Sequence, residues 1–281
     1  MRDHFTSIEE VEKILSARFS EHIATPYFVD HPQEAEPKFI AYDIFPSPGW
    51  GVIQAGTSLA ERTGDPKFLH DMLSKIVSLL YRSDSQFNDK GIGMYSGYDY
   101  SVLVDVAIYA AAQKRMRLVR NMFGVERPLS RVGYPPIKHA ANLLVGILNP
   151  LWEHGKKARS QAEQFVTAKS NSKIDKAFVR YFLGINANDS GLCLSAITEF
   201  AQLYCRSDWG RYKPFTKPVF LYGLLSIANE CYPNIVQTGK NIQVLGDVWS
   251  QLWTKYEDRF QDFNVTSFGF TGNLSFLNVS E

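Results

Sequence analysis

The sequence has few of the features that mark secreted, membrane-spanning or metal-binding proteins. Its three cysteines, Cys193, Cys205 and Cys231, are an odd number and do not have the spacing of metal ligands. No run approaches the roughly 18 consecutive apolar residues that cross a membrane. The charged N-terminal segment also lacks the apolar stretch of a signal peptide. We therefore expect a cytoplasmic protein without membrane contact, whose cysteines are reduced and buried.

An excess of charge of one sign is missing as well. The chain has 30 Lys and Arg against 29 Asp and Glu, a net charge of +1, which argues against a nucleic-acid partner. Basic residues do cluster in two places, at Lys114, Arg115, Arg117 and Arg120 and again at Lys156, Lys157 and Arg159. We interpret both clusters as solvated helix faces. The alternatives are that these residues bind phosphates or contact an acidic protein surface.

Motifs of catalysis are absent from the sequence. The six histidines are scattered singly, and His70, at the start of an amphipathic helix, is predicted to lie on its solvated face. There is no P-loop and no serine nucleophile elbow, and the glycines at 91, 93 and 97 do not fit a dinucleotide loop. Glu257, Asp258 and Asp262 could hold Mg²⁺, but a charged outer helix face is the favoured interpretation. We predict a protein that is not an enzyme and has no catalytic residues, metal or cofactor.

Apolar residues recur at helical spacing along most of the chain. This pattern, with capping and stop signals, predicts helices at 7 to about 22, 50–63, 66–80, 101–123, 137–148, 150–168, 173–185, 190–205, 217–231 and 241–263. Thr63-Gly64 followed by Asp65-Pro66 indicates the tight joint of an αα-hairpin. Residues 25–48, with five prolines, are expected to be irregular with a short extended piece near 39–45, and residues 83–99 to form a polar loop.

These elements predict an all-α fold, an irregular stack of αα-hairpins with about ten helices. No fixed repeat period is present. Residues 1–263 are expected to form a single helical domain. The tail, 264–281, is rich in Phe, Ser, Thr and Gly. Two alternatives remain for it, a small β-hairpin or an extended tail that becomes ordered only against another surface.

Candidate partner-binding residues lie in two polar, aromatic segments. Tyrosine combines apolar area with a hydrogen-bonding tip and is enriched at protein interfaces, and nearby glycines let a loop adapt. The candidates are Tyr95, Tyr98, Asp99 and Tyr100 in the loop, and Trp209, Arg211 and Tyr212 near residue 210. The alternative for the loop is that its tyrosines fold back onto the core.

Residues 178–234 show an ordered series of features. A helix ends in a joint from Gly184 to Asp189, an Ala-rich helix follows, then a polar insert from Arg206 to Lys213, then an apolar helix. In this order the segment, about a fifth of the chain, resembles the helical immunity proteins of bacterial polymorphic toxin systems, such as the immunity protein 49 family or a similar all-helical group. The resemblance implies a cytoplasmic, non-enzymatic inhibitor that acts in bacterial competition. It would bind a cognate toxin, encoded by an adjacent gene, and occlude its active site or substrate path.

Two other functions stay open. A helical adaptor or scaffold would bind peptides or partner proteins without a toxic neighbour. An all-helical metal-dependent hydrolase would need acidic residues to converge in one pocket, for which Asp99, Asp105 and Asp258 are the candidates.

Overall fold

The computed structural model describes most of the chain. The described residues are 8–40, 59–88, 101–123, 127–131, 133–207, 209, 217–231, 247–260 and 269–279. Within these ranges the regular structure is helical and contains no strand, which confirms the all-α prediction. No helix in the described ranges is both long enough and apolar enough to cross a membrane.

The chain groups into two compact units. The terminal unit comprises residues 1–92 and 251–280, and the central unit comprises residues 93–250. The single domain predicted for residues 1–263 stays a prediction.

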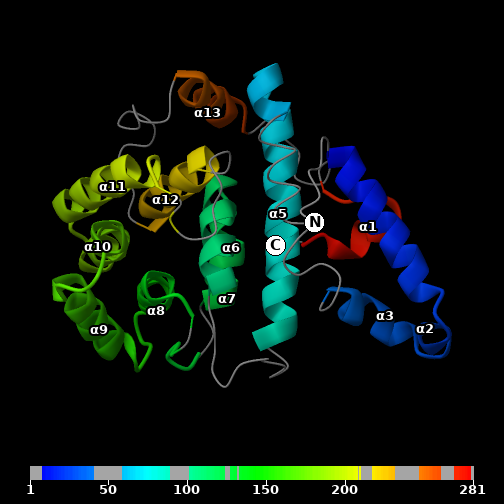
Figure 1. Cartoon of the computed structure of the whole chain (residues 1–281), viewed down its shortest axis with the longest axis horizontal. Coiled ribbons are helices and arrows are strands. Elements are labelled where there is room, and N and C mark those ends of the chain that lie inside the picture. Colours follow the sequence, from blue (N-terminus) through cyan, green and yellow to red (C-terminus); the bar gives the residue numbers. More distant parts are fainter. Residues whose placement is uncertain are drawn as a thin grey trace. The chain divides into compact units, whose positions relative to one another are not determined.

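The terminal unit is built around a long helix, α5. Its described elements are α1 (Ile8–Ile23), α2 (Pro26–Asp30), α3 (Pro32–Phe39), α5 (Pro66–Asn88), most of α13 (Asp247–Arg259) and the 3₁₀ helix η6 (Gly272–Leu277) (Figure 1). The predicted joint before α5 is confirmed, since Gly64 has a φ of +61° and Asp65 caps the helix by accepting a hydrogen bond from the Lys67 N–H. Helix α5 continues to Asn88, so the loop predicted to begin at residue 83 is wrong over 83–88.

The irregular connection predicted for residues 25–48 is wrong over its described part. Pro26 and Pro32 each occupy the first turn of a short helix, α2 and α3, where a missing N–H costs nothing. A count of prolines alone therefore misleads, because two of them start helices. The extended piece predicted near 39–45 begins instead as the end of α3, and residues 41–45 lie outside the described residues.

The described tail residues, 269–279, do not form the hairpin that was one alternative. They contain η6, which packs against α1 and α5 within the same unit. Two side chains fix this path. The Asn278 side chain exchanges hydrogen bonds of 2.8 Å with the backbone N–H and C=O of Phe270, and Asn273 contacts Ser16 and Ser20 of α1. Side-chain amides thus satisfy backbone groups that a second strand would otherwise pair.

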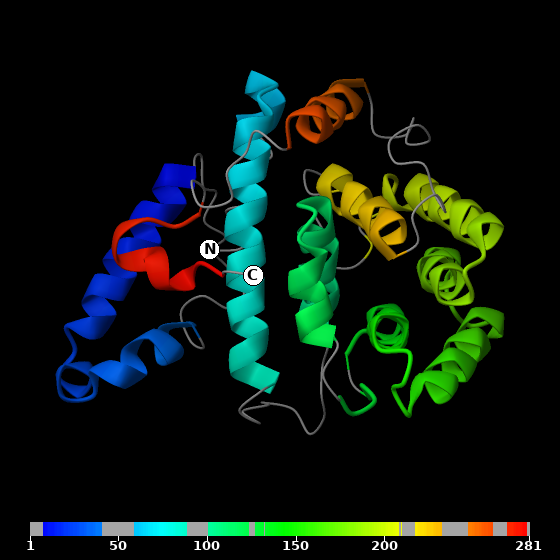
Figure 2. The same ribbon diagram turned by 180° about the vertical axis from the view of Figure 1, so that it is seen from behind.

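The central unit has seven described helices. They are α6 (Ser101–Ala112), α7 (Met116–Phe123), α8 (Pro135–Leu148), α9 (Gly155–Thr167), α10 (Lys173–Ala187), α11 (Ser190–Tyr204) and α12 (Lys217–Cys231) (Figure 2). Helices α6 and α12 are buried on all sides over most of their length and pack directly on each other. The packing is close because Gly223 of α12 has no side chain where Ile108 of α6 approaches.

The single helix predicted for residues 101–123 is wrong in one respect. It is broken at residues 113–115, where Lys114 takes the left-handed conformation with a φ of 57°. The Arg115 N–H then donates to the Ala110 carbonyl at 2.8 Å, which closes the end of α6. The predicted start at Asn149-Pro150 is also displaced, because Asn149 ends α8 and α9 begins at Gly155.

The joint between α10 and α11 forms as the sequence predicts. Asn188 adopts the left-handed conformation, and the N–H groups of Asn188 and Asp189 donate to the carbonyls of Ile185 and Gly184. This is a Schellman ending. Asp189 then caps α11 by accepting from the Leu192 N–H at 2.9 Å. The joint places α10 and α11 in close contact, with the backbone of Cys193 directly beside Gly184.

Candidate protein-binding surfaces

Most of the predicted partner-binding residues, Tyr95, Tyr98, Asp99, Tyr100, Arg211 and Tyr212, lie outside the described residues. Trp209 is described, and its side chain is only 6% exposed. Its ring packs with Phe178 of α10, Phe200 of α11 and Phe220 of α12 at centroid distances of 4.9, 5.2 and 6.4 Å. In this structure Trp209 therefore holds three helices of the central unit together.

The edge of this aromatic cluster reaches the surface at Tyr134. Asp175 Oδ1 accepts hydrogen bonds from Trp209 Nε1 at 2.6 Å and from the Tyr134 hydroxyl at 2.9 Å. Burial, together with the neighbouring Asp175 carboxylate, raises the pKa of Tyr134 to about 12. The phenol therefore stays protonated and keeps donating at neutral pH. The Asp175 carboxylate satisfies the buried indole N–H, so a structural role accounts for the cluster.

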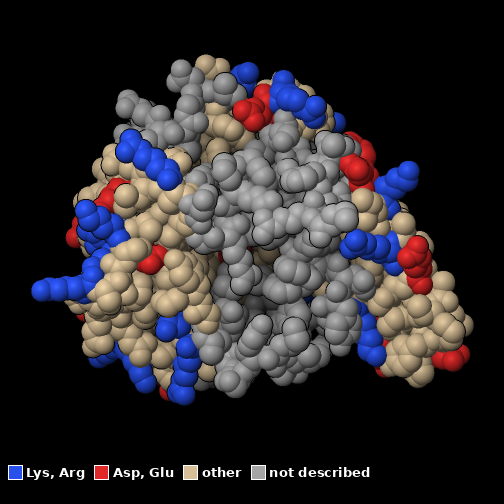
Figure 3. Space-filling view, in the orientation of Figure 1, with Lys and Arg blue, Asp and Glu red and all other residues tan. Residues whose placement is uncertain are grey.

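The joint between α1 and α2 exposes three large apolar side chains, which we call the Tyr27 surface. Ile23, Tyr27 and Val29 are 40%, 46% and 66% exposed, and no residue of α2 is buried. In Figure 3 the surface over α2 and α3 is mostly uncharged, with charged side chains at its margin. Exposed apolar side chains gathered in one short segment are typical of protein contact sites.

Tyr27 is held in one position by its neighbours. Its hydroxyl donates to Glu34 Oε2 at 2.7 Å and accepts from Lys38 Nζ at 2.8 Å, while the His31 ring stacks on it at 4.7 Å. The Lys38 ammonium also lies 4.1 Å from the Tyr27 ring centroid. The hydrogen bond from Lys38 lowers the pKa of Glu34, and the same contact raises the pKa of Lys38. An aromatic side chain fixed in advance loses little entropy on binding.

The joint between α8 and α9 carries a second exposed group, the Leu151 surface, defined by Leu151, Lys156 and Lys157. Leu151 is 94% exposed, whereas the next residue, Trp152, is 5% exposed and its indole donates to the Arg127 carbonyl at 2.7 Å. The Trp152 N–H donates to the Asn149 carbonyl at 3.0 Å. This arrangement fixes the backbone of the joint, so Leu151 is presented to solvent by a rigid turn. Lys156 and Lys157 follow in the first turn of α9, both exposed.

Charge is divided between the two units, which the total of +1 conceals. Residues 93–250 carry 19 Lys and Arg and 11 Asp and Glu, a net charge of +8, whereas residues 1–92 and 251–280 carry 11 and 17, a net charge of −6. Glu281 accounts for the remaining charge. On the face shown in Figure 3, Lys and Arg side chains project along the left and lower edge, over α9 and α10, with few acidic side chains between them.

The predicted solvated basic faces are only partly confirmed. Lys114, Arg117 and Arg120 are exposed, but Arg115 is buried, with 5% exposure. On α9 Arg159 pairs with Glu163 at 3.0 Å, whereas Lys156 and Lys157 form no ion pair with another described residue.

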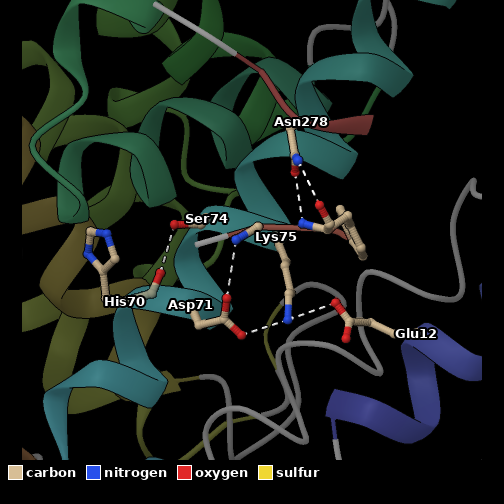
Figure 4. A network of polar contacts seen from close by, with 8 residues as sticks. Glu12, His70, Asp71, Ser74, Lys75 and Asn278 are labelled. Carbon is tan, nitrogen blue, oxygen red and sulfur yellow. Dashed lines mark hydrogen bonds and ion pairs between the residues drawn. The ribbon is translucent and has the colours of Figure 1, made fainter. Parts of the chain in front are cut away.

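A partly buried ion-pair network in the terminal unit connects α1 with α5 (Figure 4). Lys75 of α5 lies 2.8 Å from Glu12 Oε1 and 2.6 Å from Asp71 Oδ2, and its side chain is only 6% exposed. The Gly269 N–H donates to the other Asp71 oxygen at 3.3 Å, which brings the tail into the same network. The Lys75 ammonium and the two carboxylates join α1 to α5, and the Gly269 N–H adds the tail as a third segment, so the network stabilises this unit.

His70 of α5 does not lie on the solvated helix face that the sequence predicts. Predicted to be solvated, it is fully buried, and its Nδ1 lies 3.0 Å from the Tyr256 hydroxyl of α13. In the central unit His139 is buried as well. Desolvation, with a smaller contribution from the Lys138 charge, lowers the pKa of His139 to about 4, so its ring is neutral at pH 7.

Cys193 is buried as the sequence predicts, whereas Cys205 and Cys231 are only half-buried. Burial raises the pKa of the Cys193 thiol to about 12 and that of Cys231 to about 11. Thiols in this state are weak nucleophiles.

Among the described side chains, no three His, Cys, Asp or Glu lie close enough together to hold a metal ion. Asp105 is half-buried in the central unit and Asp258 is exposed in the terminal unit, while Asp99 and Asp262 lie outside the described residues. Whether acidic residues converge, as the hydrolase alternative requires, stays untested.

No family model matches this chain, and no characterised protein or solved structure is significantly similar to it.

Sequence reasoning missed both exposed surfaces. Tyr27 and Val29 of the Tyr27 surface lie between two prolines, Pro26 and Pro32, in a segment interpreted as an irregular connection. Leu151 follows Asn149-Pro150, which was interpreted as a helix start. In both places a Pro beside a large apolar residue, outside the helical periodicity, is the signal that could have pointed to an exposed joint.

Proposed function

We propose that this chain is an immunity protein that binds a cognate bacterial toxin domain and neutralises it by occluding its active site or substrate path. The observation that carries the proposal is that large apolar side chains are held exposed on fixed helix joints, above all Leu151 and Tyr27. Burying one such side chain in a partner contributes about 1.5–3 kcal/mol. Hydrogen bonds fix the joint beside Leu151 and the side chain of Tyr27 itself, so little of that gain is lost to ordering.

The segment that resembles helical immunity proteins adds support. Residues 178–231 contain the end of α10, the joint at Gly184 to Asp189, then α11 and α12, in the order on which the resemblance rests. The separation of charge between the units also suits a binding protein, since a strong local field accelerates the encounter with a complementary surface.

Co-expression tests this function. Induction of the toxin domain encoded by the gene immediately upstream should stop growth of a bacterial host, and co-expression of this chain should restore it. A helical protein of similar size, expressed to the same level, serves as the control and should give no rescue. The proposal fails if no neighbouring reading frame is toxic, or if this chain gives no more protection than the control.

A further inference from the structure

The Leu151 surface places one strongly exposed aliphatic side chain beside two lysines on a rigid joint. We propose that this surface is where the toxin docks, and that the toxin offers there an acidic face around an apolar pocket. This inference rests on the proposed function and adds the chemistry of the partner. Leu151 is the anchor that enters the pocket, and Lys156 and Lys157 form a basic rim around it.

The geometry of the joint favours Leu151 as an anchor. Trp152 turns inward and donates its indole N–H to Arg127, so the backbone cannot rotate to bury Leu151 in its place. The Gly155 N–H donates to the Trp152 carbonyl at 3.0 Å, which completes the turn and starts α9. The described part of the chain therefore offers Leu151 no apolar cover, and a partner pocket would supply it.

The charges favour an acidic partner. Glu153 opposes one of the two lysines, since its 3.1 Å contact with His154 offsets its charge only when the histidine is protonated. Neither lysine forms an ion pair within the described part of the chain. Lys169 and Lys173 add positive charge at the other end of α9, roughly 20 Å away by the rise of the helix. Since the Debye length is about 8 Å in physiological salt, the near lysines act at the contact and the distant ones mainly steer the approach.

A protein fits this surface better than a nucleic acid does. Lysines alone would suit a phosphate backbone, but phosphates offer no pocket for an aliphatic side chain, and Leu151 would stay in water. The Tyr27 surface gives a weaker indication of the partner's charge. Its cation, Lys38, is already paired with Glu34 at 2.7 Å, so these two charges offset each other beside the tyrosine.

Binding of the purified upstream-encoded toxin domain to the full-length chain tests the inference. Leu151→Ser should weaken binding on the order of 10- to 100-fold, mainly through faster dissociation. The double variant K156E/K157E should slow association on the order of tenfold at low salt, with a smaller effect in 0.5 M NaCl. The matched control K13E/K67E changes the net charge by the same amount at exposed lysines of the terminal unit and should bind like the wild type.

The outcomes separate this inference from the proposed function. If the wild-type chain binds the toxin and the Leu151 and lysine variants bind equally well, the docking site is wrong and the function stands. An equal loss in K13E/K67E also refutes the site, because it would show an effect of net charge alone. If the wild-type chain does not bind the toxin, both fail. Binding of a 30-base-pair DNA duplex that is abolished by K156E/K157E, without toxin binding, refutes the acidic protein partner. All variants should keep the wild-type thermal midpoint, since the altered side chains are exposed.

Discussion

Gly223 lies where α12 packs against α6, and its replacement by alanine tests how these two helices approach. A Cβ atom at this position would lie 2.5 Å from the Ile108 carbonyl oxygen and 2.4 Å from Ile108 Cγ2. The methyl group of Ile108 could rotate away, but its carbonyl is part of the α6 backbone. Alanine is the better helix former by roughly 0.8–1 kcal/mol, whereas overpacking a tight core costs about 1–3 kcal/mol. Because the Ile108 carbonyl oxygen is a backbone atom and cannot move aside easily, we expect an overpacking cost of about 3 kcal/mol. The net destabilisation is then about 2 kcal/mol.

Gly146 of α8 is a matched control for this substitution. It also lies inside a helix, but its nearest neighbour, Gly155 Cα, would be 3.8 Å from the new Cβ. Gly146→Ala should therefore stabilise the protein by up to about 1 kcal/mol. Urea unfolding followed by far-UV circular dichroism measures the free energy of unfolding of both variants. In thermal unfolding, Gly223→Ala should lower the midpoint by roughly 4–8 °C. Equal stability of the two variants would refute the close approach of α6 and α12.

Three further substitutions or treatments follow from buried polar groups. The pKa of His139 is lowered from 6.5 to about 4, so its contribution to stability is complete above pH 6.5 and is lost as the pH falls toward 4. The urea midpoints measured at pH 5 and at pH 7.5 should therefore differ less in His139→Gln than in the wild type. An unchanged difference would contradict this. Lys75→Met leaves Glu12 and Asp71 without their cation and should lower the free energy of unfolding in urea by about 3 kcal/mol. Adding Glu12→Gln to this variant should restore part of the lost stability. Cys193, whose pKa burial raises to about 12, should not react with iodoacetamide at pH 8 until urea unfolds the protein; modification at native rates would contradict its burial.

The fold was predictable where helical periodicity and end signals agree. The starts and ends of α1, α10, α11 and α12 lie within a few residues of their predicted positions. The α10–α11 joint shows why, because Asn188 and Asp189 are the residue types that a left-handed ending and an N-cap require. Such local rules depend only on neighbours in the chain, so one sequence is enough to apply them.

Burial of polar side chains on α5 was not predictable in the same way. His70, Ser74, Lys75 and Ser78 are all buried, although the apolar positions of α5 indicate one buried face and one solvated face. The partners of His70 and Lys75 are Tyr256 and Glu12, which are far away in the sequence. Lys114 shows the same limit for the backbone, since nothing in a run of good helix formers indicates a left-handed residue. Contacts between distant segments decide these cases.

The candidate binding surfaces depend on a different property, the distribution of charge and exposure. Net charge is a sum over the chain, whereas the attraction between two proteins depends on charges within about a Debye length of the contact. A total of +1 therefore does not exclude a strongly charged partner when residues 93–250 carry +8 and the rest of the chain carries −7. A balanced total charge therefore does not exclude a polyelectrolyte partner for this chain. What still favours a protein over a nucleic acid is Leu151, because only a partner with an apolar pocket gains from an exposed leucine beside the lysines.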